Sequence, residues 1–258
     1  MHDPVTLLCL PCAGASATMY LRWRRTLPAW VHVLPVELPG RGGRLAEDFC
    51  QDFDSLAAQL CDEQAPHLQG KYALFGHSMG ALLAYGITRR LQAQGKPLPL
   101  ALLLSGSPAP SQRDAERFAC KDDDAGLIED LRRQGGTPDE VFDSPELLRI
   151  TLDVLGADYR ICESFRHTTP AALPMPLHVL AGRQDPITAE RIGAWQEEGQ
   201  GTFTLDWFDG NHFFVRHQEA EVLDTVQRRL AQSLRAGAAD AADAADAADT
   251  NDSAHVAA

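Results

Sequence analysis

The sequence predicts an α/β protein in which helices cover both faces of a mostly parallel sheet, with a helical insertion. Short apolar runs bounded by turn residues recur along the chain, and segments with helical periodicity lie between them. We expect strands at residues 5–10, 31–36, 72–75, 100–104, 177–180 and 203–208. Strands that alternate with helices in this way are typical of a parallel sheet.

A helix is expected directly after the third strand, at residues 81–94. Its apolar side chains recur at the spacing of one helical face, and Gly95 follows as a typical C-terminal stop. These apolar residues are Leu82, Leu83, Ile87 and Leu91. The third strand and this helix therefore predict a strand–turn–helix unit.

The segment from about residue 107 to 176 interrupts the alternation. It contains no clear strand and is far longer than an ordinary connection. It has helix starts of its own, because Thr137-Pro138-Asp139-Glu140 fits a capping box and Ser144-Pro145 repeats the order of cap residue and proline. We therefore expect a helical lid inserted into a single domain of residues 1–235.

Residues 236–258 form a tail in which Ala and Asp repeat with a period of three. This period does not keep the Asp residues on one helical face, and Ala alone buries too little area to anchor the segment. We expect the tail to be disordered.

The composition excludes several classes of partner. The formal net charge is −13 and no basic stripe could offset it, so we expect no nucleic-acid partner. The chain begins without a secretory-signal pattern and its apolar runs are too short to span a bilayer, so we expect a cytoplasmic protein with no membrane partner. The six cysteines are spread through a chain long enough to be stabilised by core burial, and we interpret them as reduced thiols.

The sequence Gly76-His77-Ser78-Met79-Gly80 has the pattern G-x-S-x-G and lies between the third strand and its helix. A turn sharp enough to project a serine above the sheet brings neighbouring backbone so close that only glycine fits at its two ends. The helix that follows directs its N-terminal dipole and free N–H groups at the same place, which favours negative charge there. We predict Ser78 as a nucleophile, on a turn of the kind found in α/β-hydrolases.

A serine hydroxyl needs a base within hydrogen-bond reach and an acid that orients the base. In α/β-hydrolases the acid and then the base follow the serine in the chain, each on a loop after a later strand. Of the nine histidines, His212 lies on the loop after the last predicted strand, whereas the alternative His217 lies at the start of the final helix. This position predicts His212 as the general base.

The acid is expected on the loop after the preceding strand. Asp185 is the one carboxylate in that loop, and Pro186 fixes the turn beside it. Asp206 lies within a predicted strand and Asp209 lies only three residues before His212, so neither fits the place. We predict Asp185 as the acid that orients His212.

Two backbone N–H groups must also face the carbonyl oxygen of the substrate. Met79, the residue after the serine, supplies one, and the loop Pro11-Cys12-Ala13-Gly14 after the first strand must supply the other. Cys9 and Cys12 have the spacing of a redox or metal pair, but neither a thioredoxin-like setting nor a second ligand pair accompanies them. We interpret Cys9 as a small buried strand residue and Cys12 as part of the loop.

Further motifs extend from about residue 7 to residue 230. They are "LPCAGASATMY" after the first strand, "ELPGRGGR" after the second, "FGHSMGAL" at the serine, "GGTPDEV" and "LGADYRICESF" in the lid, "GRQDPI" at the acid and "GNHFF" at the base. Generic hydrolases share only the serine motif, whereas the lid motifs and P-G-R-G are specific. With them the sequence resembles the type II thioesterases, the free-standing editing enzymes of polyketide and nonribosomal peptide assembly lines.

This resemblance implies an α/β-hydrolase fold and hydrolysis of stalled or aberrant acyl thioesters on the phosphopantetheine arm of carrier proteins. It implies Ser78 as nucleophile, His212 as base, Asp185 as its acid, and the N–H groups of Ala13 and Met79 as the oxyanion hole. No cofactor or metal is expected, and the expected partners are acyl or peptidyl carrier proteins. Two positions depart from the family pattern, because Ala15 stands where a second glycine is usual and Asn211 stands where glycine is common.

The same fold leaves other functions open. These are a product-releasing or cyclising thioesterase, a small-molecule esterase or lipase, and a non-catalytic binder with a hydrolase shell. Carrier proteins tend to be acidic and so is this chain, so docking would need a local basic patch. The candidates are Arg22, Arg25, Arg41 and Arg44, with Arg24 beside them. We expect the protein to be a monomer.

Overall fold

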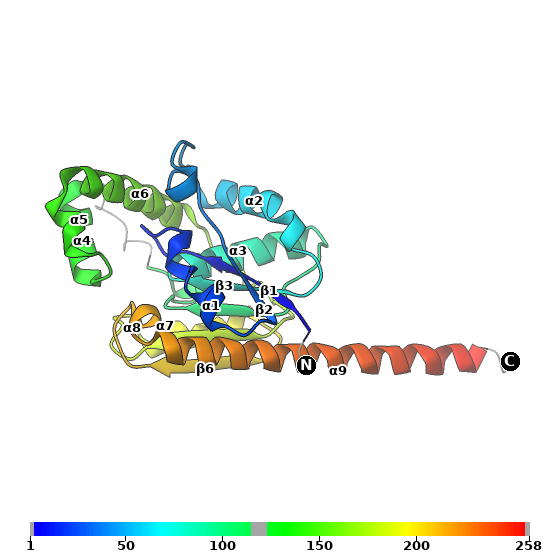
Figure 1. The fold of residues 1–258 in the computed structure, drawn as a ribbon. Coiled ribbons are helices and arrows are strands. Elements are labelled where there is room, and N and C mark those ends of the chain that lie inside the picture. Colours follow the sequence, from blue (N-terminus) through cyan, green and yellow to red (C-terminus); the bar gives the residue numbers. More distant parts are fainter. Residues whose placement is uncertain (1–2, 115–122, 256–258) are drawn as a thin grey trace.

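The structure, a computed structural model, describes residues 3–114 and 123–255, with side chains through residue 239. Its centre is a six-stranded sheet in the order β2-β1-β3-β4-β5-β6, in which all neighbouring strands are parallel (Figure 1). The strands are β1 (Val5–Leu10), β2 (Val31–Pro35), β3 (Tyr72–His77), β4 (Leu102–Ser105), β5 (Leu177–Gly182) and β6 (Phe203–Phe208). The predicted parallel α/β sheet is therefore confirmed.

Helices and short 3-10 turns connect the strands. Before β4 they are η1 (Ala17–Tyr20), α1 (Trp23–Thr26), η2 (Gly42–Arg44), α2 (Phe53–Glu63), η3 (Ala65–His67) and α3 (Met79–Ala93). After β4 they are η4 (Pro110–Gln112), α4 (Asp124–Gln134), α5 (Asp139–Asp143), α6 (Pro145–Ser164), α7 (Ala189–Gly193), η5 (Ala194–Glu198), α8 (Phe214–His217) and α9 (Glu219–His255).

The central strands are buried on both faces, because their successive side chains point to opposite sides and each side is covered by helices. On β1, Leu8 and Leu10 pack with α2 and α3, whereas Leu7 and Cys9 pack with α1 and the first half of α9. Every residue of β3, the strand that leads to Ser78, is buried. The core therefore holds the end of β3 in place, and Cys9 is the buried strand residue that we predicted.

Three helices, α4, α5 and α6, lie between β4 and β5 in the chain and pack together at one end of the molecule (Figure 1). Ser144 caps α6 through its hydroxyl, which accepts from the N–H of Leu147, and Pro145 occupies the first turn, as the sequence indicated. The helix start predicted at Thr137-Pro138 lies one residue later. Pro138 is extended and precedes the helix, so α5 begins at Asp139. Leucine side chains and Tyr159 join α4 to α6 in a separate cluster.

The last helix, α9, continues to His255 and projects well beyond the sheet (Figure 1). The helical backbone through residue 255 differs from our expectation of disorder in the Ala/Asp tail. Ala has the highest helix propensity of all residues. The first turns of α9 are already held in a helix by packing on the sheet, so the Ala residues that follow can extend it. Within the described residues, no helix combines the length and apolar character needed to cross a membrane.

Replacing His178 with Asn should make the stability of the protein less sensitive to acid. His178 of β5 is buried, with its ring nitrogens 2.8 Å from the Thr204 hydroxyl and 2.9 Å from the Ser233 hydroxyl. Burial lowers its pKa to about 4, whereas a histidine in the unfolded chain titrates near about 6.5. Below that pH the unfolded state gains a proton that the native state does not, which removes up to about 3 kcal/mol by the time the pH reaches about 4.

Urea denaturation of both proteins from about pH 7 to about pH 4 checks this prediction. The free energy of unfolding should fall more steeply for the wild type than for His178→Asn. His32→Asn is the matched control, since His32 also lies on a strand but is exposed, and it should follow the wild type. An equally steep fall in His178→Asn would show that this histidine does not carry the acid sensitivity.

Candidate active site

Ser78 lies in a strained turn between β3 and α3. Its φ of 56° and ψ of −113° are unusual for a residue with a side chain. A Cβ on Gly76 would lie 2.0 Å from the carbonyl oxygen of Gly80, and a Cβ on Gly80 would lie 2.1 Å from that of Leu10. The close backbone approach that we inferred from the two glycines is therefore present, and it projects Ser78 into a cavity.

His212 and Asp185 meet at the carboxyl ends of β5 and β6. The His212 Nδ1 atom lies 2.7 Å from Asp185 Oδ2, and the two side chains are 8% and 1% exposed. The other oxygen of Asp185 accepts from the backbone N–H of Ile187, which orients the carboxylate. With Nδ1 donating to Asp185, His212 keeps Nε2 as an acceptor on the side of the cavity.

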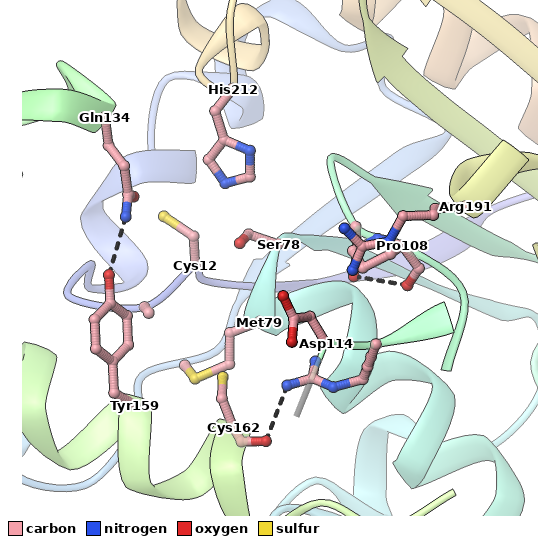
Figure 2. A pocket seen from close by; sticks show the side chains of 13 residues that line it. Cys12, Ser78, Met79, Pro108, Asp114, Gln134, Tyr159, Cys162, Arg191 and His212 are labelled. Carbon is pink, nitrogen blue, oxygen red and sulfur yellow. Dashed lines mark hydrogen bonds between the residues drawn. The ribbon is translucent and has the colours of Figure 1, made fainter. Parts of the chain in front are cut away.

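Figure 2 shows the His212 ring facing the Ser78 hydroxyl across this cavity, with Cys12 and Met79 beside the serine. The structure thus brings together the three side chains that the sequence placed on separate loops. The alternatives lie elsewhere. Asp206 pairs with Arg229 of α9, and Asp209 is an exposed partner of Arg183. His217 ends α8 with its side chain exposed.

His77 is a residue whose role the sequence did not indicate. It is fully buried, its Nδ1 lies 2.9 Å from the Ser105 hydroxyl, and its ring packs against that of His212 at a centroid distance of 5.0 Å. Burial holds its pKa well below the usual value, with the neighbouring His212 adding to the effect. A neutral His77 ring thus packs against His212 in the interior of the protein. The serine motif marked position 77 as variable, so only the three-dimensional contact reveals this.

The loop after β1 forms part of the wall of the cavity at Ser78. Cys12 and Ala13 line it, and the Ala15 N–H donates to the Cys12 carbonyl at 3.1 Å, which closes a tight turn. Gly14 occupies the turn with a φ of 76°, a conformation that favours glycine. Its own N–H donates to Asp158 of α6, so this N–H already has an acceptor within the protein.

Cys9 and Cys12 are free thiols, one buried in the sheet and one in the cavity wall. Burial raises the pKa of Cys12 to about 11, so the thiol stays protonated near neutral pH and is a poor nucleophile. Among the side chains that the structure describes, in residues 3–114 and 123–239, no group of three or more His, Cys, Asp or Glu is arranged to hold a metal ion. Cys12 is therefore part of the loop, as interpreted from the sequence.

A second cavity, of about 420 Å³, adjoins the first beneath the lid. Cys12, Ala13 and Gln134 line both cavities, so they form the boundary. Gln134 of α4 donates to the Tyr159 hydroxyl of α6 at this boundary (Figure 2). An elongated molecule could therefore extend from Ser78 along the loop after β1 and under the lid helices.

The structure separates the four arginines that we considered as a docking patch. Arg41 is 5% exposed and pairs with Asp158, so its assignment to a docking surface is wrong. The sequence could not show this burial, because the partner lies in the lid. Arg44 is enclosed by two carboxylates, at 2.6 and 2.7 Å. Arg22 and Arg25 remain exposed. Arg22 forms one loose ion pair, at 3.7 Å, with the first residue of α9.

Comparison with known proteins adds independent evidence. A family model described as a thioesterase domain matches residues 5–230. Thioesterase PikA5 of Streptomyces venezuelae is 34% identical over 231 residues, which cover 89% of this chain and 82% of that protein.

Two solved structures show the same fold. The thioesterase RedJ, from the prodiginine biosynthetic pathway in Streptomyces coelicolor, is 36% identical with a TM-score of 0.80, over 88% of this chain and 90% of RedJ. The type II thioesterase BorB, from the borrelidin biosynthetic cluster, is 39% identical with a TM-score of 0.79, over 88% of this chain and 93% of BorB.

The family match begins at the first strand and ends within α9, so it includes the sheet, the lid and every loop of the cavity. RedJ and BorB are thioesterases of biosynthetic pathways, as the sequence motifs indicated for this chain. The chain therefore belongs to the thioesterase family on the α/β-hydrolase fold, and within it to the type II thioesterases of polyketide and nonribosomal peptide biosynthesis.

Proposed function

We propose that the protein hydrolyses stalled or unsuitable acyl groups from the phosphopantetheine arm of carrier proteins, through an acyl-enzyme on Ser78. The observation that carries this proposal is the buried pair of His212 and Asp185, 2.7 Å apart, beside the cavity into which Ser78 projects. A serine with such a base and acid can attack a thioester carbonyl. The biosynthetic setting of the relatives supports a carrier-bound substrate.

In the proposed mechanism, His212 Nε2 takes the proton of the Ser78 hydroxyl as Oγ attacks the thioester carbonyl. The negative charge that develops on the carbonyl oxygen is stabilised by the N–H groups of Ala13 and Met79. The tetrahedral intermediate collapses, and the pantetheine thiol leaves with the proton from His212. Water activated by His212 then attacks the acyl-enzyme and releases the carboxylic acid. The proposed steps use the Ser78 and His212 side chains, two backbone N–H groups, the substrate and one water.

The two adjoining cavities differ in size, since the one at Ser78 is about 30 Å³ and the one beneath the lid is about 420 Å³. The cavity at Ser78 is lined by polar as well as apolar side chains, and the larger cavity continues under the lid. We propose that the substrate reaches Ser78 by way of the larger cavity, with the lid helices limiting the size of acyl group admitted.

Ser78→Ala should abolish thioesterase turnover, since no other group takes the place of the nucleophile. A loss of about 10⁴- to 10⁶-fold in kcat is expected. The measurement is release of short-chain, long-chain and aminoacyl groups from loaded carrier proteins by both proteins. Near-normal turnover by Ser78→Ala would refute the serine mechanism. Rapid cleavage of simple oxygen esters, without preference for the carrier-bound thioesters, would favour a small-molecule esterase over an editing enzyme.

Asp185→Asn should leave the fold intact and lower kcat by about 10³- to 10⁴-fold, because the amide no longer favours the tautomer with the proton on Nδ1 of His212. Asp209→Asn is the matched control, since Asp209 is an exposed acid three residues before His212. It should retain wild-type turnover on the same loaded carrier protein. An equal loss in the two variants would show that the effect does not depend on the acid bound to His212.

The double charge reversal Arg22→Glu and Arg25→Glu tests the remaining docking candidates. If these exposed arginines attract an acidic carrier protein, kcat/KM for the carrier-bound thioester should fall and its salt dependence should weaken. Turnover of a small acyl-pantetheine thioester serves as the control and should not change. An unchanged kcat/KM with the carrier protein would remove Arg22 and Arg25 from the docking surface.

A further inference from the structure

Asp158 of lid helix α6 is a buried acid next to the loop after β1. Its side chain is 1% exposed, and its Oδ2 atom accepts from the Gly14 N–H at 2.8 Å and from Arg41 Nη1 at 2.6 Å. Its Oδ1 atom accepts from Arg41 Nη2, also at 2.6 Å. A carboxylate that receives a bidentate guanidinium and a backbone N–H has a fixed orientation.

Arg41 holds the same loop from its other side. Its Nη1 atom also donates to the Ala15 carbonyl at 3.2 Å. The N–H of Gly14 and the carbonyl of Ala15 are therefore both bound to one ion pair. Packing adds to this, because a Cβ on Gly14 would lie 3.3 Å from Leu155, one turn before Asp158 on α6.

Ala13 lies inside the turn that this ion pair holds. The turn is closed on its other side by the bond from the Ala15 N–H to the Cys12 carbonyl. The Cys12 carbonyl and the Ala13 N–H belong to one planar peptide unit, so the bond that holds this carbonyl also holds the direction of the Ala13 N–H. Asp158 and Arg41 hold the next peptides along the chain, so the turn has little freedom to rotate on either side of Ala13, which lines the cavity with Ser78.

We propose that Asp158, paired with Arg41, is a positioning residue that aims the Ala13 N–H at the oxyanion. The proposal rests on the Ser78 mechanism above. It gives the P-G-R-G motif and the lid sequence "LGADYR" a joint role, namely holding the oxyanion loop. The lid helix thereby takes part in the reaction through the loop without touching the substrate carbonyl.

Asp158→Asn removes the anion that receives the Gly14 N–H. The expected result is a fall in kcat of about 10- to 100-fold with KM changed by less than about 3-fold, because complete loss of one oxyanion donor costs about 10²- to 10³-fold. The double variant Arg41→Met with Asp158→Leu removes the same acceptor while replacing the buried charges by apolar groups, so it tests the proposal if the single variant does not fold. It should show the same loss.

Two pantetheine analogues distinguish positioning from general disruption. In the first, a trifluoromethyl ketone replaces the thioester; Ser78 Oγ attacks its carbonyl, the hydroxyl proton goes to His212, and a tetrahedral oxyanion forms. In the second, a thioether has CH₂ in place of the carbonyl and cannot form an oxyanion. Both variants should bind the ketone more weakly by about the factor lost in kcat, and bind the thioether as the wild type does. Asp206→Asn, which breaks the bidentate pair with Arg229 far from the loop, should change neither affinity.

Full kcat and ketone affinity in a folded variant would overturn the proposal, as would equal loss of affinity for both analogues. The Ser78 mechanism is judged separately in the wild type. Tight binding of the ketone that Ser78→Ala abolishes supports that mechanism whatever the Asp158 variants do.

Discussion

The contact on which the site depends is the approach of the α3 N-terminus to the end of β1. Gly80 packs against the carbonyls of Leu10 and Pro11 so closely that a Cβ there would lie 2.1 Å from the first of them. This contact places the turn at Ser78 beside the loop that begins at Pro11. The N–H of Met79 at the helix start and the peptides of the loop are therefore neighbours, although about 65 residues separate them in the chain.

The parallel sheet explains why so much of the site could be predicted from the sequence. All its strands end at the same edge, so the residues just after β3, β5 and β6 meet there. Chain order and position after a strand were enough to select Ser78, Asp185 and His212. The apolar runs predicted the strands for a similar reason, since strands buried on both faces are continuously apolar.

Long-range pairing of polar side chains could not be predicted in this way. Arg41 and Asp158 are 117 residues apart, and no periodicity links them, so the sequence suggested an exposed arginine in a basic cluster. The packing of His77 on His212 is equally invisible, because position 77 of the serine motif tolerates many residues. The helical tail was not predicted, because the composition of the tail shows only that it cannot bury a core of its own. It does not show that α9 already provides a helix for Ala residues to extend.

The chemistry of the buried pair explains why charge is present at a place where apolar residues could pack. Apolar side chains at positions 41 and 158 could match the pair in stability, but they would leave the N–H of Gly14 without an acceptor. A carboxylate alone would accept that bond, but its negative charge would oppose the oxyanion that we propose beside Ala13. The guanidinium cancels that charge and also binds the Ala15 carbonyl. An aspartate with an arginine therefore meets three requirements together: an acceptor for Gly14, a donor for Ala15 and no net charge near the reacting carbonyl.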